Sequence, residues 1–479
     1  MKKLLDKPFH LILKLLEHFY KKTPQETISY YSEFLNVDRR TILKIITDLE
    51  RDIAESHWEE QLTLEVTETK ITATFSSNFS LENFYRYYME RSLCVELVQS
   101  IFKEPETSLD QIIENFFVSR TTFYRRITPL KEVLAEFDLE LDFTKKQYII
   151  GEEKQIRYFF SVFFWEIFRS TGSYKHPAML DKEYLASIHS NLNLQLPAFL
   201  YFQLYLNIAL TRISQGYLVG QAISYPIIEP NYSYTQFKEL VAPYFNTLEH
   251  SQQDKEIYTL YFFCLTSTLY PKSVTDLLPI QKIPELKFAK KWIQYYVDYF
   301  DTILSNDDYV YLYLNLILIH EKSKNFRGGI SSFGVNSVAE VLMEENPDVL
   351  NHSSQFFNFL SKKEEEFHIA PFQVLDYTLL IRRLLVSAAT PLHLSVCSKV
   401  GQEEAEWVQN LIRKICSVPV EFHQADYPDL DLVISDFPLP PDLISVPSDR
   451  VFIWLTFPSI REWQALLFKL EEIYYTKLN

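Results

Sequence analysis

The sequence predicts a mainly α-helical, multidomain protein that ends in a small α/β domain. Three observations lead to this prediction. One stretch near residue 40 recurs 81 positions later, and a different stretch near residue 204 recurs 108 positions later. The 479 residues include 31 Tyr and 37 Phe but only 8 Gly, which suits packed helices better than loop-rich enzyme sites. After Pro391, short apolar runs alternate with a helical pattern, as in parallel α/β folds.

The most informative stretch runs from Val118 to Leu134 and reads V-S-R-T-T-F-Y-R-R-I-T-P-L-K-E-V-L. At helical spacing its apolar residues form one stripe and its cationic and hydroxyl residues form the opposite face. The stripe is Phe123, Ile127, Leu130 and Leu134, and the opposite face is Thr121, Arg125 and Thr128. Ser119 is the expected N-cap, and a short amphipathic helix from Leu109 to Phe116 precedes the turn. The pattern predicts a helix-turn-helix, and the alternative is a core helix with a solvated basic face.

The same pattern occurs 81 positions earlier, from Val37 to Leu49, as V-D-R-R-T-I-L-K-I-I-T-D-L. Identical pairs are Val37/Val118, Arg39/Arg120, Thr41/Thr122, Ile46/Ile127, Thr47/Thr128 and Leu49/Leu130, and Lys44 stands opposite Arg125. Each copy is followed by an alternating segment, residues 62–75 and 139–150, whose period of two predicts a β-hairpin wing. Because core packing does not require such a duplication, the repeat favours two winged helix-turn-helix units.

A helix of this kind can enter the major groove, where guanidinium groups meet guanine edges and hydroxyls meet phosphates. The side chains predicted to face the groove are Arg40, Thr41 and Lys44 in the first unit and Thr121, Thr122, Tyr124 and Arg125 in the second. The side chains predicted to contact phosphates are Arg39, Arg51, Arg120, Arg126, Lys70, Lys145 and Lys146. Pro129 would kink or end the second helix, so the helix is predicted only as far as Thr128.

Charge and composition limit the other classes of function. The net charge of −16 argues against a nonspecific nucleic-acid coat but permits local DNA contact, because charges beyond about 8 Å are screened at physiological salt. The sequence shows neither an apolar run of about 18 residues nor a signal peptide, so we expect a soluble, cytoplasmic protein without membrane contact. Nucleotide-binding and hydrolase motifs are lacking, and we expect neither catalysis nor a cofactor. The four cysteines, Cys94, Cys264, Cys397 and Cys416, show no disulfide or metal spacing.

The remaining chain divides into three further domains. L-Y-L-N-I-A-L-T-R from Leu204 is answered by L-Y-L-N-L-I-L-I-H from Leu312, which predicts two related helical domains with a boundary near residues 277–284. The last domain is predicted to contain the strands L-H-L-S-V-C, V-P-V-E-F and D-L-V-I-S, with helices over residues 402–415 and 462–475. The predicted domains are residues 1–80, 81–152, 153–280, 281–390 and 391–479.

With these parts in this order, the chain resembles the Mga/AtxA family of virulence transcription regulators of Gram-positive bacteria over its full length. The motifs that carry the resemblance are R-R-T-I-L-K-I-I-T-D-L and R-T-T-F-Y-R-R-I. The resemblance implies two winged helix-turn-helix units, two all-α regulation domains (PRD) of the sugar phosphotransferase system (PTS), and a C-terminal α/β domain like the IIB component (EIIB). It also implies a regulator that binds double-stranded promoter DNA and forms a homodimer or higher homo-oligomer, with possible control through the phosphocarrier protein of that system.

Regulation domains of this kind often carry a phosphorylated histidine in a run resembling H-[IL]-x-F-A-[IL]-x-R. Here Tyr205 and Tyr313 occupy the histidine position. The remaining candidate phosphorylation sites are His176, His189, His250, His320, His352 and His368. Cys397 follows the first strand of the last domain, where IIB proteins carry a phosphocysteine, although Gly401 is the only glycine in its loop. Two alternatives to a regulator therefore remain open: a phosphotransfer carrier that uses Cys397 and a histidine, and a protein-binding scaffold.

Overall fold

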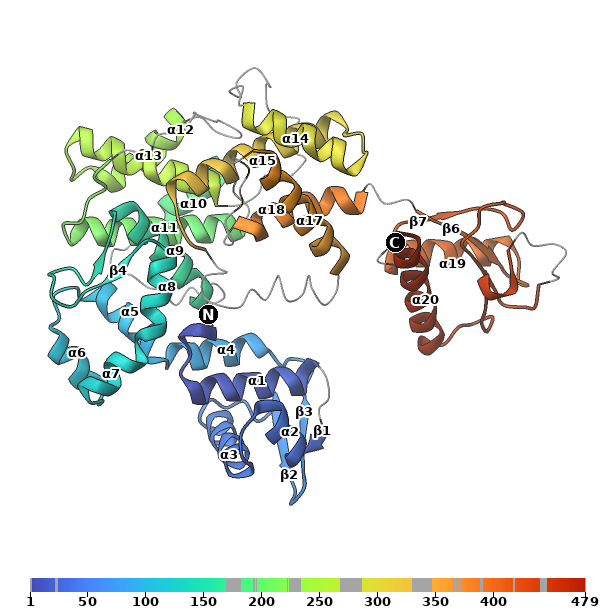
Figure 1. Cartoon of the computed structure of the whole chain (residues 1–479), viewed down its shortest axis with the longest axis horizontal. Helices are drawn as coiled ribbons and strands as arrows, with labels where there is room; N and C mark the ends of the chain where they lie inside the picture. Colours follow the sequence, from blue (N-terminus) through green and yellow to red (C-terminus); the bar gives the residue numbers. More distant parts are fainter. Residues whose placement is uncertain are drawn as a thin grey trace. The chain divides into compact units, whose positions relative to one another are not determined.

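A computed structural model describes most of the chain. The described residues are 2–21, 25–168, 182–192, 194, 196–221, 223, 234–267, 287–329, 347–364, 367, 369, 373–387, 391–416, 418–439 and 446–478. They divide into two compact units, residues 1–381 and residues 382–479 (Figure 1). No helix among the described residues is both long and apolar enough to cross a bilayer.

The N-terminal part of the first unit contains the first copy of the repeat. Its elements are α1 (Lys7–Lys21), β1 (Gln25–Thr27), α2 (Ile28–Leu35), α3 (Arg39–Glu55), β2 (Leu62–Val66) and β3 (Lys70–Phe75), preceded by a 3-10 turn (Lys2–Leu4). Strands β2 and β3 pair antiparallel from Leu62↔Phe75 to Val66↔Ile71, which confirms the hairpin predicted over residues 62–75. The sequence did not predict β1, a three-residue strand that adds to the free edge of β3 (Figure 1). Buried residues of α1, α2 and α3 form one apolar core under this sheet.

The second copy of the repeat follows directly. Its elements are α4 (Leu81–Glu90), α5 (Leu93–Lys103), α6 (Leu109–Asn115), α7 (Arg120–Arg126), α8 (Thr128–Glu136), β4 (Glu140–Leu141) and β5 (Ile149–Ile150). The helix expected up to Thr128 ends two residues earlier, and Pro129 occupies the first turn of α8, where its missing N–H costs little. The predicted apolar stripe is fully buried across both helices: Phe123, Ile127, Leu130 and Leu134 each have 0% exposure.

The rest of the first unit is helical in its described parts. Its helices are α9 (Glu153–Phe168), α10 (Lys182–Leu192), α11 (Leu196–Ser214), α12 (Tyr234–Val241), a 3-10 turn (Ala242–Phe245), α13 (His250–Thr266), α14 (Lys287–Phe300), α15 (Asn306–Asn325), α17 (Pro347–Lys363) and α18 (Val374–Ser387). The two copies of the second repeat lie in α11 and α15, and Tyr205 and Tyr313 are buried in them. The predicted boundary at residues 277–284 lies outside the described residues.

A buried ion-pair network joins α9, α11 and α13. The guanidinium of Arg157, only 1% exposed, donates to both carboxylate oxygens of Glu256 and, at 3.0 Å, to Glu153. Arg212 of α11 donates to the two oxygens of Glu153 at 2.9 and 2.7 Å. Two arginines and two glutamates therefore pair with one another in the protein interior. Their charges compensate as long as all four side chains are present.

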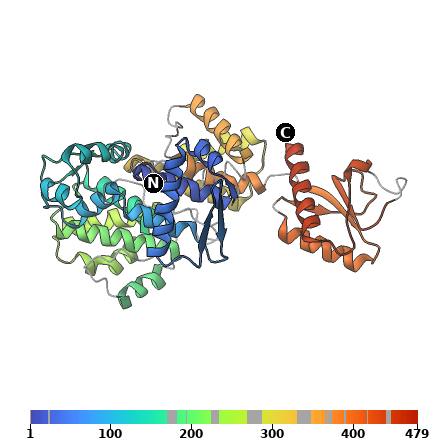
Figure 2. The ribbon, with the colours of Figure 1, turned by 90° about the horizontal axis from the view of Figure 1, so that it is seen from below.

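The second unit is a small α/β domain. Its elements are β6 (Leu392–Cys397), α19 (Gln402–Ile415), β7 (Val420–Phe422), β8 (Leu432–Ser435), a 3-10 turn (Ser448–Arg450), β9 (Val451–Ile453) and α20 (Ile460–Leu478). The sheet order is β7-β6-β8-β9 and every pair is parallel, as the strand–helix–strand pattern predicts. In Figure 2 this unit, coloured orange to red, is seen as a small sheet with helices beside it. Residues of α19 and α20 share one core with Leu392 and Leu394 of β6, so both helices cover the same face of the sheet.

Candidate nucleic-acid interface

In the first copy of the repeat a tight turn joins α2 to α3, which is the order of elements in a helix-turn-helix. The chain turns at Asn36, which adopts a left-handed conformation (φ 52°), and its N–H donates to Glu33 O. Asp38 then caps α3, because its carboxylate accepts the backbone N–H of Thr41 at 2.8 Å. That hydrogen bond holds the pKa of the Asp38 carboxyl below its usual range. The turn and the cap fix the start of α3, which buries Ile42 against the core.

The second helix-turn-helix, α6 and α7, repeats this backbone geometry at the same offset of 81 residues. The N-cap residues and the left-handed residues around α2 and α3 each have an equivalent residue 81 positions later. The pairs are the N-caps Thr27/Ser108 and Asp38/Ser119 and the left-handed residues Asn36/Phe117 and His57/Asp138. The hydrogen bonds at the ends of α3 and α8 also match, with Trp58 N donating to Ile53 O and Leu139 N donating to Leu134 O. The two copies are therefore similar in backbone structure as well as in sequence.

The N-cap of α7 offers a direct test of this geometry. The hydroxyl of Ser119 accepts the N–H of Thr122 at 3.2 Å, so Ser119→Ala should leave this N–H unsatisfied and lower the unfolding free energy by about 1 kcal/mol. Ser119→Asp supplies an equivalent acceptor and should retain most of the stability. Urea unfolding followed by circular dichroism measures both, and equal losses in the two variants would contradict the role of Ser119 as a cap.

The side chains predicted to face the groove lie on α3 in the first copy of the repeat and on α7 in the second copy. Arg40 and Lys44 on α3, and Thr121, Tyr124 and Arg125 on α7, are exposed, whereas Thr41 and Thr122 are half-buried. The Thr122 hydroxyl also accepts a hydrogen bond from Ser119 Oγ at 2.9 Å, so it takes part in the cap. Each unit therefore presents a long cation, Lys44 or Arg125, at the same point of its second helix.

The predicted phosphate contacts next to these helices include the hairpins. Arg39 donates to the carbonyl of Glu68 at 2.7 Å, which ties the start of α3 to the β2–β3 turn, and exposed Lys70 begins β3. In the second unit Lys145 and Lys146 are exposed between β4 and β5, and Lys146 lies 3.4 Å from Glu106. Arg120 forms an exposed ion pair with Asp110 at 2.6 Å, a contact worth little because water and salt screen it.

Two further residues predicted to contact phosphates, Arg126 and Arg51, each pair with more than one carboxylate oxygen. Arg126 is half-buried, and its Nε and Nη2 donate to the two carboxylate oxygens of Asp6 at 2.9 and 2.5 Å. This bidentate pair fixes α7 to the segment that precedes α1. Arg51 lies in the last part of α3 and pairs with Asp48 at 3.0 Å and Asp52 at 3.4 Å. Both arginines are therefore left out of the interface proposed below.

The candidate phosphorylated histidines do not converge on a common site in the described part of the chain. His176 and His368 lie outside the described residues, and His250 and His352 are exposed. His189 places Nε2 2.8 Å from the carbonyl of Leu194 and stacks on Phe199. His320 stacks on Phe288 at 3.8 Å, and burial together with Lys324 lowers its pKa to about 4, so its ring is neutral near pH 7.

Cys397 ends β6, as predicted. Hydrogen-bond donors of the loop after it, however, are already bound to a carboxylate from the end of β8. Asp436 accepts the N–H of Lys399 at 2.7 Å and the hydroxyl of Ser398 at 3.0 Å. A phosphoryl group on Cys397 would need loop N–H donors of this kind and would meet the negative charge of Asp436. Burial raises the pKa of the Cys397 thiol, and Asp436 raises it further, so the less nucleophilic protonated form dominates at neutral pH.

Comparison with known proteins identifies part of this region. Residues 77–164 match the Mga helix-turn-helix domain family, and they contain the second helix-turn-helix. The chain is also 26% identical over 167 residues to a protein of Streptococcus pneumoniae serotype 4 named "Putative trans-acting regulator". That match spans 35% of this chain and 32% of the relative, about a third of each.

The fold and the domain match define the class of protein: a chain with a DNA-binding helix-turn-helix domain of the kind found in transcriptional regulators. The two matches together support assignment to the Mga family of regulators, which confirms the family predicted from the sequence. The first helix-turn-helix precedes the matched residues, and its relation to the second rests on the 81-residue repeat.

Proposed function

We propose that the protein is a transcriptional regulator that binds promoter DNA through both helix-turn-helix units. The observation that carries the proposal is the repeat of caps, left-handed turns and exposed cations at one offset, in a second copy that matches an Mga DNA-binding domain. A buried stripe on one side and Lys44 or Arg125 on the other is the arrangement that a groove-reading helix needs. The first copy has the same arrangement, so it has the same capacity to bind.

The contacts can be divided by chemistry. Arg40, Lys44 and Arg125 project far enough from their helices to reach base edges, where guanidinium and ammonium groups read guanine. The hairpin lysines Lys70 and Lys145 are suited to phosphates, which fix the protein on the duplex without reading sequence. Because the whole chain carries a net charge of −16, we expect weak binding to arbitrary DNA and a strong preference for specific sites.

Selection from a pool of random duplexes tests the proposal and requires no assumption about the operator sequence. The full-length protein should enrich one sequence family over several rounds at about 0.15 M salt. Enrichment of no sequence, or equal recovery of all duplexes, would contradict the proposed function and favour a protein-binding scaffold.

We further infer that the later domains control self-association. In the second unit, several large apolar side chains are well exposed, including Leu455 (65%), Phe457 (82%), Ile460 (79%) and Phe468 (72%). Such exposure in one small domain is typical of an interaction surface. A homodimer would also present paired DNA-binding units to a symmetric site. Sedimentation of the full chain tests this inference, and a strictly monomeric protein at micromolar concentration would contradict it.

The helical domains and the C-terminal domain are proposed to be PRD-like and EIIB-like modules that retain the fold of PTS components without phosphotransfer through Cys397. The support is the carboxylate of Asp436, which follows β8 and already accepts hydrogen bonds from the loop residues Ser398 and Lys399, beside a protonated thiol. We expect no thiol-linked phosphate after incubation with the phosphocarrier system and phosphoenolpyruvate, as measured by mass spectrometry of the intact chain. A phosphate that disappears in Cys397→Ser would instead support the carrier alternative.

A further inference from the structure

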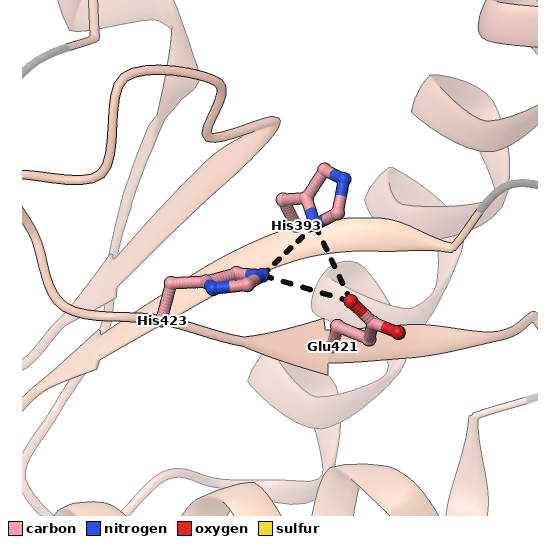
Figure 3. A group of neighbouring side chains, drawn as sticks. All are labelled: His393, Glu421 and His423. Atoms are coloured by element: carbon pink, nitrogen blue, oxygen red, sulfur yellow. Dashed lines mark hydrogen bonds and ion pairs between the residues drawn. The ribbon is translucent and has the colours of Figure 1, made fainter.

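Three side chains with metal-binding atoms converge on the C-terminal sheet. His393 in β6 is in register with Glu421 in β7, and His423 follows β7 directly, its N–H donating to the carbonyl of Leu394 at 2.8 Å. Since Leu392 and Leu394 point to the helices, strand alternation directs His393, Glu421 and His423 to the opposite face. Figure 3 shows the two rings and the carboxylate directed toward one another.

The distances in this cluster suit a small tetrahedral ion. His393 Nδ1 lies 2.9 Å from His423 Nε2, and an oxygen of Glu421 lies 3.8 Å from the first nitrogen and 3.9 Å from the second (Figure 3). Ligands about 2.0–2.2 Å from a tetrahedral Zn²⁺ are about 3.3–3.6 Å from one another. The three observed edges bracket this range, so shifts of a few tenths of an ångström would bring all three atoms to bonding distance.

The surroundings hold the ligands in this arrangement. The ring of Tyr427 stacks on His423 with centroids 4.0 Å apart and planes 11° apart, and it also contacts His393 at 5.5 Å. Asp431 accepts the backbone N–H of His393 at 2.8 Å and is paired with Lys477 at 2.7 Å. Support of this kind around metal ligands lowers the cost of ordering them when an ion binds.

The cluster is also open to solvent on one side. The Glu421 side chain is 59% exposed, whereas those of His393 and His423 are 19% and 24% exposed. A hydrated ion can therefore reach the carboxylate first and exchange its water for the two imidazole nitrogens. Three protein ligands leave a fourth tetrahedral position for water.

We propose that His393, Glu421 and His423 form a binding site for a divalent transition-metal ion, with Zn²⁺ preferred and water as the fourth ligand. Two imidazoles and one carboxylate suit Zn²⁺ better than Mg²⁺ or Ca²⁺, which prefer all-oxygen sites. The ion clips β7 to β6. Because β7 is a three-residue edge strand whose pairing in the described sheet is with β6, the bound ion would stabilise this edge of the sheet.

The alternative is a metal-free hydrogen bond between the rings. At 2.9 Å one ring nitrogen must carry a proton and donate to the other, whereas a metal requires a lone pair on both. Metal binding and this hydrogen bond therefore exclude each other, which makes the two states distinguishable. Only the metal site requires Glu421, since the histidine pair is complete without it.

The test uses the full-length protein after treatment with a chelator. Equilibrium dialysis with metal analysis measures Zn²⁺ binding, and the visible spectrum of added Co²⁺ reports coordination geometry. We expect one ion per chain, a tetrahedral Co²⁺ spectrum and a rise in melting temperature with Zn²⁺. Glu421→Gln should weaken binding at least about tenfold, and His423→Gln should abolish it.

Matched controls separate the site from general effects. His352→Gln replaces an exposed histidine of the first unit, and Cys397→Ser removes a neighbouring thiol, so both variants should bind Zn²⁺ as the wild type does. Glu421→Gln in chelator should melt like the wild type in chelator, because the metal-free contact between His393 and His423 does not involve this side chain. Glu421→Gln alters an exposed side chain and keeps the test valid if a histidine variant unfolds. The proposal is overturned if the wild type binds no ion at 10-fold excess of Zn²⁺ over chain, or if Glu421→Gln and His423→Gln bind unchanged.

Discussion

Replacing Arg40, Lys44 and Arg125 together by Ala is expected to weaken binding to the selected duplex by at least about 100-fold. Each side chain is exposed on the outer face of α3 or α7, and loss of one base contact costs about 1–3 kcal/mol. Three losses near the lower limit add to about 3 kcal/mol, or about 160-fold, if the contacts act independently. Because none of the three is buried, the fold should persist. Fluorescence anisotropy at one fixed salt concentration measures the change.

A charge-matched control is available in the same chain. Lys287, Lys362 and Lys414 are exposed lysines outside the two helix-turn-helix units. Their triple alanine variant has the same net charge as the test variant, so a general electrostatic effect would weaken both equally. The proposed interface requires the control to bind within a few fold of the wild type. Equal losses in the two variants would show that the two second helices do not carry the specific contacts.

Glu256→Ala is expected to lower the unfolding free energy of the helical region by about 3–5 kcal/mol, the usual cost of an uncompensated buried charge. The substitution removes the carboxylate that accepts both terminal nitrogens of Arg157, a residue with 1% exposure. It also removes the acceptor for the N–H of Val219 at 3.0 Å. Urea unfolding followed by tryptophan fluorescence and by circular dichroism measures the effect.

The same helix supplies a control for this prediction. Asp254 on α13 pairs with Lys238 at 2.6 Å, but both side chains are exposed, at 54% and 40%. Asp254→Ala should therefore cost no more than about 1 kcal/mol, as exposed ion pairs do. Equal losses of unfolding free energy in the two variants would contradict the role of burial in the stability that the Arg157–Glu256 pair provides.

The features that the sequence predicted well are those that depend on neighbours in the chain. The stripe from Phe123 to Leu134, the Ser119 cap and the hairpin over residues 62–75 follow from helical or strand periodicity and from capping chemistry, which act over a few residues. The break beside Pro129 follows from the missing N–H of proline. Because the repeat brings the same local signals twice, each copy supports the prediction made for the other.

The features that the sequence did not predict depend on tertiary contacts. Nothing near Arg126 indicates that Asp6, 120 residues away, would take its guanidinium, so a cation on a basic helix was interpreted as a phosphate contact. The cluster of His393 and His423 depends on the register of β6 with β7. This register brings His393 beside Glu421, although the helix α19 separates them in the sequence. Spacing rules for metal sites search short segments, and these ligands come from two strands.

The most direct test of the central claim is the salt dependence of binding to the selected duplex, measured for the wild type, Lys70→Ala, Lys145→Ala and the double variant. Each lysine lies on the hairpin of a different unit. If both units hold the same duplex, the slope of log K against log salt should become shallower by about 1 for each single variant and by about 2 for the double variant. A slope that changes with Lys145→Ala but not with Lys70→Ala would contradict the claim that the first unit binds DNA.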